Sequence, residues 1–176
     1  MAADTGFVEM RLSKVVAVSS APDDASFCVV LDAVSGGRRL PISIGPTEAV
    51  ALSASLRGTG LPRPMSPQFA AGLVRALGGR VRQVRIDRLV PVHDGHAYGS
   101  TLELEGASGV ESVDARPSDA LNLVALLPAP ILVAPEVLAD AEARMAGDSP
   151  EAAALRRALD SEQLAWRREP RSGHRP

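Results

Sequence analysis

Apolar and polar residues follow the pattern of β-strands along three early segments, residues 8–19, 26–34 and 38–44. Side chains of a strand point alternately to the two faces of a sheet, so short apolar or alternating runs with β-branched residues predict strands. A break at residues 21–24 and a glycine-rich turn at residues 35–38 separate the three segments. Together they predict an antiparallel meander.

The period of the pattern then changes to that of a helix. The next segment starts at Pro46, carries Glu48 in its first turn and stops at Gly58. Each of these residues suits its place in a helix. A second helix is predicted over residues 66–78, with Ser66 as its cap. Its apolar stripe is formed by Phe69, Leu73, Val74 and Leu77.

The second half of the chain continues with strands and then helices. The pair Asp94-Gly95 marks a hairpin between two of these strands. The expected elements are strands at 80–92, 97–106 and 109–115, a helix at 117–126, a short buried strand at 129–135 and helices at 135–147 and 148–168. Runs of strands joined by turns favour an α+β fold over a doubly wound one. We therefore expect a mixed, mainly antiparallel sheet with packed helices.

Composition narrows the class of protein. The net charge of −2 argues against a surface coated with basic residues for nucleic acid. Cys28, the only cysteine, stands in an apolar run, which favours a buried thiol. Lys14 is the only lysine, and this excess of arginine indicates a GC-rich bacterial genome. We expect neither a signal peptide nor a membrane span, and hence a cytoplasmic protein.

Four motifs occur in an order and spacing typical of one family. They are LPISIGPTEA (residues 40–49), LPRPMSPQF (61–69), VDARPSDALNLV (113–124) and APILVAPEVL (129–138). By these motifs the chain resembles the bifunctional nuclease domain family over roughly residues 8–140. The resemblance implies a compact α+β domain, a homodimer, and cleavage of both DNA and RNA. A C-terminal helical extension (141–168) and a disordered tail (169–176) are expected to follow.

The chain departs from the family pattern at two places. After the R-P of the second motif, relatives commonly carry L-T-H-D, and here the His and Asp positions hold Pro67 and Gln68. This chain therefore cannot use a histidine at that position for proton transfer. Near the end of the helix after the third motif, Leu126 stands where relatives often carry arginine. Both changes remove polar chemistry.

Carboxylates and arginines in the motifs are the candidate site residues. Metal-assisted hydrolysis of a phosphodiester needs carboxylates clustered around divalent ions, and an arginine helps to neutralise the phosphate. The expected catalytic residues are Glu48, Asp114, Arg116 and Asp119. The expected ligands of Mg²⁺ or Mn²⁺ are Glu48, Asp114 and Asp119, and the expected contacts to a DNA or RNA substrate are Arg63 and Ser118.

Structural roles compete with catalysis at the same positions. A carboxylate in the first turn of a helix, as expected for Glu48 and Asp119, gains about 0.3–1 kcal/mol from the helix dipole. Asp114 and Arg116 could pair with each other, and Asp87 suits a solvated or paired residue of a strand. The alternative function is therefore a non-catalytic, dimeric binding or regulatory domain.

Overall fold

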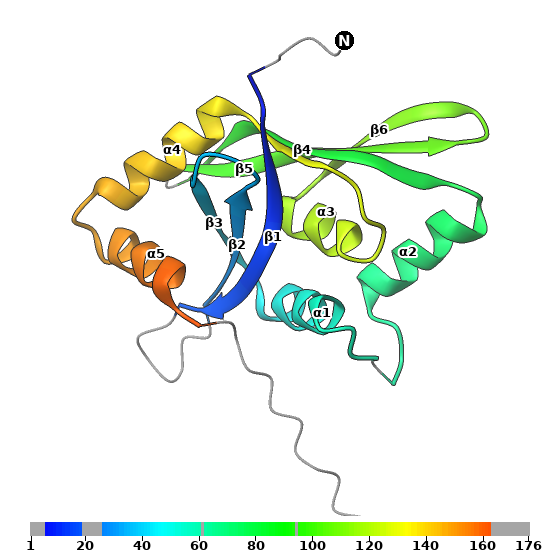
Figure 1. Cartoon of the computed structure of the whole chain (residues 1–176), viewed down its shortest axis with the longest axis horizontal. Helices are drawn as coiled ribbons and strands as arrows, with labels where there is room; N and C mark the ends of the chain where they lie inside the picture. The colour runs from blue at the N-terminus through cyan, green and yellow to red at the C-terminus, as the bar shows by residue number, and fades with distance from the viewer. Residues whose placement is uncertain (1–5, 19–25, 61, 94, 163–176) are drawn as a thin grey trace, which may run out of the picture.

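The computed structural model describes residues 6–18, 26–60, 62–93 and 95–162. Seven strands and five helices follow one another in the order that the sequence predicts (Figure 1). The strands are β1 (Val8–Ala17), β2 (Phe27–Ala33), β3 (Arg39–Ile44), β4 (Arg80–Val92), β5 (Gly95–Gly106), β6 (Gly109–Ala115) and β7 (Ile131–Val133). The helices are α1 (Pro46–Leu56), α2 (Ser66–Ala76), α3 (Pro117–Val124), α4 (Pro135–Ala146) and α5 (Pro150–Asp160).

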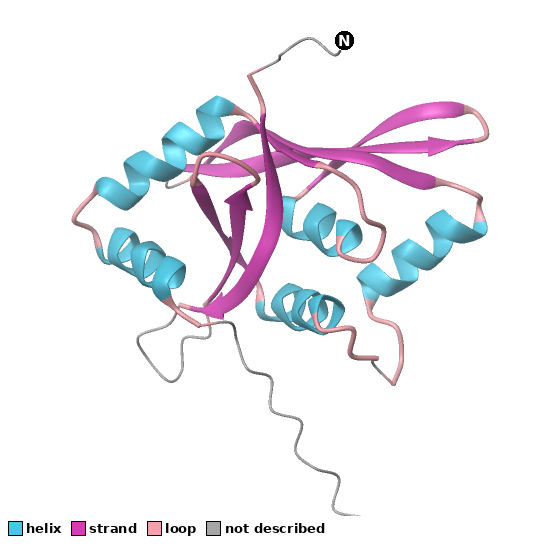
Figure 2. Cartoon of the chain, viewed as in Figure 1, coloured by secondary structure: helices cyan, strands magenta, loops and turns pink. Residues whose placement is uncertain are grey.

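All seven strands join one sheet in the order β3-β2-β1-β7-β4-β5-β6. Every neighbouring pair is antiparallel except β4 and β7, which run parallel. The short strand β7 thus joins the β1–β3 meander to the β4–β6 meander. Figure 2 shows the helices arranged around this curved sheet. The predicted α+β class with a mixed, mainly antiparallel sheet is confirmed.

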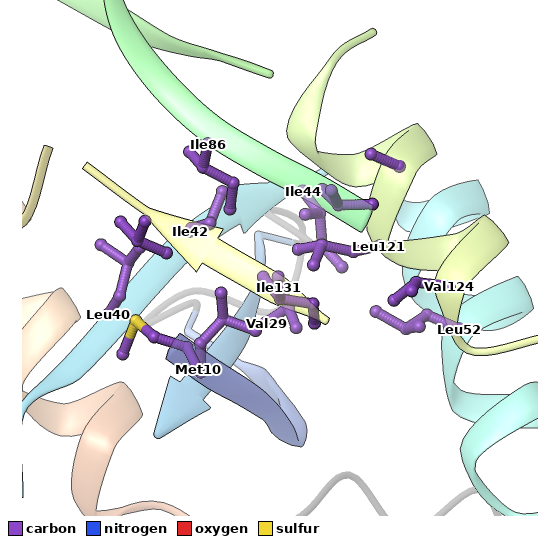
Figure 3. Packing of buried hydrophobic residues seen from close by; sticks show 14 of the residues in the cluster. Met10, Val29, Leu40, Ile42, Ile44, Leu52, Ile86, Leu121, Val124 and Ile131 are labelled. Atoms are coloured by element: carbon purple, nitrogen blue, oxygen red, sulfur yellow. The ribbon is translucent and has the colours of Figure 1, made fainter. Parts of the chain in front are cut away.

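The main core lies where the sheet meets α1, α3 and α4. Figure 3 shows side chains from β1 to β4 and β7 meeting Leu52 of α1 and Leu121 of α3. Strand β2 is buried on both faces, because Val29 points into this core while Cys28 packs under α5 against Leu155. Burial on both faces explains why this strand reads as a continuous apolar run.

The predicted boundary at residue 140 falls inside α4, whose Ala141 belongs to the main core. The expected final helix is observed as α5, and Ser149 caps it by accepting a hydrogen bond from the backbone N–H of Ala152 at 3.0 Å. The remainder of the predicted extension and the predicted tail, residues 163–176, lie outside the described residues. None of the helices in the described part combines the length and hydropathy needed to cross a membrane.

The apolar stripe predicted for α2 exists but does not face the core. The side chains of Phe69, Leu73 and Leu77 are 60%, 47% and 80% exposed, and Ala71 is the one buried residue of the helix. The expected cap is also corrected, since Met65 and not Ser66 precedes the first turn. The backbone N–H of Met65 donates to Gln68 Oε1 at 3.2 Å. Gln68, one of the departures from the family pattern, therefore stabilises a helix start.

The buried thiol of Cys28 gives a prediction at alkaline pH. Burial raises its pKa from the ordinary value of 9.0 to about 12. The folded state therefore favours the protonated thiol, and the resulting stability is fully present below about pH 9 and is lost as pH rises towards 12. We expect a thiol reagent at pH 8 to leave the native protein unmodified and to modify the unfolded protein in urea. Rapid modification of the native protein would contradict the buried position.

Candidate functional site

Helices α1 and α3 begin in the same way and pack against each other. Each starts with a proline, Pro46 or Pro117, and each carries an acidic residue, Glu48 or Asp119, in its first turn. The N-terminus of a helix carries a partial positive charge, which favours a carboxylate there. The two helices contact each other, so the first and third motifs bring their carboxylates to one corner of the molecule.

Arg116, the residue before α3, links the two carboxylates. Its Nε and Nη2 donate to the two carboxylate oxygens of Asp119 at 2.8 and 2.9 Å, and Nη2 also donates to Glu48 Oε1 at 2.9 Å. We call these three residues the Arg116 cluster. The hydrogen bonds that Arg116 donates to Asp119, and then the one that it donates to Glu48, raise the pKa of Arg116, which stays charged.

The third guanidinium nitrogen of Arg116, Nη1, donates to no residue of the described part of the chain. The arginine side chain is 66% exposed, Asp119 is 50% exposed and Glu48 is 20% exposed. The cluster has a net charge of −1, from two carboxylates and one guanidinium. The partial positive charges of the two helix N-termini together offset about one unit of negative charge. An anion can therefore approach Nη1 without meeting a strongly negative surface.

Gly45 lets Glu48 fold back over the start of its own helix. A Cβ atom at position 45 would lie 2.5 Å from Glu48 Oε2. Any side chain at this position would therefore push the carboxylate of Glu48 away. The glycine of the first motif keeps that carboxylate within reach of Arg116.

Asn122 links α3 to α1 through a hydrogen bond beneath the cluster. This buried side chain donates from Nδ2 to the backbone oxygen of Glu48 at 3.2 Å and to that of Ser118 at 3.0 Å. Its Oδ1 is buried and accepts no hydrogen bond within the described residues. From sequence, Asn122 is only a polar interruption of an apolar run. The signal that could have identified it is its position four residues after Ser118, on the buried face of the helix.

Asp114 lies apart from the Arg116 cluster. Neighbouring residues of a strand point to opposite faces, so Ala115 packs against the core while Asp114 points outward from β6. Its 85% exposed carboxylate contacts Arg88. Arg88 also pairs with Asp87 at 2.6 Å, which confirms the interpretation of Asp87 as a paired strand residue. The structure thus brings together three of the four predicted catalytic residues.

The two predicted substrate contacts occupy different places. Ser118 is buried in the first turn of α3 and lines a cavity beside Arg116. Arg63 is exposed in the loop before α2 and lines neither of the cavities that adjoin the cluster. Its role in binding substrate stays a prediction.

Arg116 lines two cavities. The small cavity, about 340 Å³, lies between α1, α2, α3 and the strands β5 and β6. The large cavity, about 580 Å³, lies between β3, the start of β5, α3 and the helices α4 and α5. A ligand that contacts Arg116 can therefore extend into either space.

The lining of the large cavity includes a second arginine, Arg144. Arg144 Nη2 donates to the backbone oxygen of His96 at 2.6 Å, and its guanidinium lies 5.3 Å from the centre of the Tyr98 ring. The Tyr98 hydroxyl donates to Asp140 at 3.0 Å, and burial raises its pKa, so the hydroxyl stays protonated. The sequence suggested only an isolated tyrosine here, because α4 supplies its partners from more than 40 residues away.

The arrangement of the carboxylates does not fit the metal site expected from sequence. Within the described residues, no group of three His, Cys, Asp or Glu side chains is placed to hold a metal ion. Asp114 is remote from the other two carboxylates, and the guanidinium of Arg116 binds both Glu48 and Asp119. A divalent ion would have to displace Arg116 from at least one of them. The use of Mg²⁺ or Mn²⁺ stays a prediction.

Comparison with known proteins identifies the family. The profile of the bifunctional nuclease domain matches residues 29–146, which include the whole Arg116 cluster. The chain belongs to this family. An uncharacterised protein of Mycobacterium tuberculosis is 33% identical over 125 residues, which cover 71% of this chain and 72% of that protein. Bifunctional nuclease 1 of Oryza sativa subsp. japonica is 37% identical over 97 residues, which cover 53% of this chain and 28% of that relative.

Proposed function

We propose that this bifunctional nuclease domain hydrolyses phosphodiester bonds of DNA and RNA at the Arg116 cluster. The position of Arg116 carries the proposal: two carboxylates hold this side chain, its Nη1 has no partner within the described residues, and it adjoins two cavities. Membership of a family that includes plant bifunctional nucleases supports the choice of substrate. Arginine is well suited to a phosphate because its planar fork offers several N–H donors.

The residues of the cluster have separate roles in the proposed reaction. Arg116 binds the scissile phosphate and stabilises the charge that develops on it. Asp119, the more exposed carboxylate, accepts a proton from the attacking water. The water oxygen bonds to phosphorus, the bond from phosphorus to the leaving sugar oxygen breaks, and that oxygen takes a proton from solvent. Glu48, the less exposed one, holds the guanidinium in place. Ser118 and Arg63 are proposed as further contacts to the DNA or RNA strand. Asp114 takes no part in the proposed reaction because it lies on another face.

A cleavage assay with matched variants tests the proposal. Wild-type protein, Asp119→Asn and Glu48→Gln are purified in parallel and incubated with single- and double-stranded DNA and RNA. Separate reactions contain Mg²⁺, Mn²⁺ or EDTA, which tests the predicted metal. We expect Asp119→Asn to lower the rate about 10²-fold or more, because the reaction loses its general base.

The control for this assay is Glu142→Gln. Glu142 pairs with Arg38 at 2.8 Å on the surface and lines neither cavity, so its loss should leave the rate unchanged. Cleavage that is equal in wild-type protein and Asp119→Asn would show that the activity comes from a contaminant or another site. The absence of any cleavage by wild-type protein would favour the non-catalytic binding domain.

We also propose that α2 is the contact of a homodimer. Its exposed residues Phe69, Gly72, Leu73 and Ala76, with the C-cap residue Leu77, follow the spacing of a single apolar helix face. The small residues between the large ones allow the backbones of two such helices to approach closely. An exposed apolar face of this kind typically marks an interaction surface.

Replacing Leu73 with glutamate is expected to convert the dimer to a monomer, because the charge would be buried without a partner. Light scattering coupled to size-exclusion chromatography, at several protein concentrations, measures the mass. Val34→Glu is the control, since Val34 is an exposed apolar residue (56%) remote in sequence from α2. A wild-type protein that is monomeric at every concentration, or a Leu73→Glu protein that remains dimeric, would rule out this contact.

A further inference from the structure

The small cavity beside the Arg116 cluster combines apolar walls with one charged side. Leu102 of β5, Leu123 of α3 and Ala70 of α2 contribute to the walls, and Met65 adds a flexible side chain. The charged side is the cluster itself, with Glu48, Arg116 and Asp119. Its volume of about 340 Å³ is within the range of sites for small organic groups. No step of the proposed hydrolysis uses these apolar walls.

The walls and the charged side together select an amphipathic ligand. The apolar part must fill a space lined by helices and sheet, and an anionic part must reach Arg116 Nη1, which has no partner within the described residues. A nucleotide has this form, because the faces of its base are apolar and its phosphate is attached through one sugar. The charge of the phosphate complements that of the guanidinium.

Two hydroxyl groups in the cavity suit the polar edge of a base. Thr47 and Ser66 both line the cavity, from the first turns of α1 and α2. A hydroxyl can donate or accept a hydrogen bond, so it pairs with the edge of any base and selects none. The cavity therefore suits a base without defining its identity, as a nuclease that acts on both DNA and RNA requires.

We infer that the small cavity binds one unpaired nucleobase of a DNA or RNA strand whose phosphate lies on Arg116. The inference rests on the proposed function and specifies its substrate as single-stranded nucleic acid. A base in a duplex is stacked and its edge is paired, so it must leave the double helix before it can lie between the walls of this cavity. Duplexes should therefore react only where their strands separate.

Binding of three small probes tests the inference without turnover. Thymidine 5′-monophosphate, deoxyribose 5-phosphate and inorganic phosphate contain no phosphodiester bond, and calorimetry or NMR titration gives their affinities. We expect the nucleotide to bind wild-type protein about 10-fold or more tightly than deoxyribose 5-phosphate. Equal affinities for these two probes, or no binding of the nucleotide, would overturn the inference.

Replacing one of two alanines with leucine tests whether the nucleotide binds in the small cavity. Ala70→Leu fills the cavity from α2 and should remove the advantage of the nucleotide, whereas Ala143→Leu places the same side chain at an exposed position of α4 that lines neither cavity. The nucleotide retaining its advantage in a folded Ala70→Leu protein would also overturn the inference. The wild-type comparison needs no variant and decides the question even if Ala70→Leu does not fold.

Arg116→Ala separates this inference from the proposed function. If Arg116 binds phosphate, its loss weakens all three probes. Suppose that the three probes bind wild-type protein with equal affinity and that all three bind Arg116→Ala more weakly. This result would refute the base site and leave the phosphate site intact. Binding that is independent of Arg116 would refute both.

Discussion

Replacing Arg116 with alanine is expected to lower kcat/KM for cleavage of a single-stranded oligonucleotide by about 10²–10³-fold. The substitution removes the donor that binds the phosphate. It also leaves the carboxylates of Glu48 and Asp119 facing the substrate without their shared cation. Two unneutralised carboxylates repel a phosphate, so both binding and the chemical step should suffer. Single-turnover and steady-state rates measure the two effects separately.

The effect of Arg116→Ala on folding should be small. The side chain is 66% exposed, and exposed ion pairs contribute about 0–1 kcal/mol. Urea unfolding should therefore show little change while cleavage is nearly lost. Arg116→Lys is the informative companion, because lysine keeps the charge but cannot bind two carboxylates and a phosphate with one planar group. A wild-type rate in Arg116→Ala would place the reaction at another site.

Replacing Asn122 with alanine is expected to lower the free energy of unfolding by about 1–3 kcal/mol, because two buried hydrogen bonds are lost. These bonds reach the backbone oxygens of Glu48 and Ser118 and join α1 to α3. Without them Glu48 is less firmly placed against Arg116, so cleavage should fall as well. Urea unfolding and kcat/KM are the two measurements.

Asn122→Leu separates the two consequences. Leucine fills the space and removes the buried oxygen that has no partner in the described residues, so part of the stability should return. Activity should not return, because leucine cannot donate the hydrogen bond that joins α3 to α1. Ser53→Ala is the control: this buried hydroxyl of α1 has no partner within the described residues, and its loss should be nearly neutral. Wild-type cleavage by Asn122→Leu would show that the link does not position the site.

Local patterns predicted most elements of the fold. Strand β4 occupies residues 80–92 as expected, and α4 begins at Pro135, because alternation, helix-start residues and turn residues act over short distances. The pattern could not show that β7 lies parallel to β4, since this pairing depends on tertiary packing. It also revealed the apolar stripe of α2 without showing that Leu77 faces solvent.

The candidate site was predicted in part for similar reasons. Glu48 and Arg116 are 68 positions apart, and only the shared motif pattern suggested both before the structure placed them 2.9 Å apart. Asp114 is two positions from Arg116 yet on a different face, because the chain passes there from a strand to a helix. Nearness in sequence was misleading at this junction. The role of Asn122 depends on a contact across two helices, which no local pattern contains.

The most direct test of the Arg116 cluster as a nuclease site is rescue of Arg116→Ala by free guanidinium ion. The single-turnover rate of oligonucleotide cleavage is measured as guanidinium is added at concentrations well below those that unfold the protein, with sodium chloride as the ionic-strength control. We predict a saturable rise in the rate for Arg116→Ala and no rise for Asp119→Asn, which keeps the guanidinium of Arg116 and lacks the proposed general base. Cleavage by Arg116→Ala at the wild-type rate, with no response to guanidinium, would contradict the assignment.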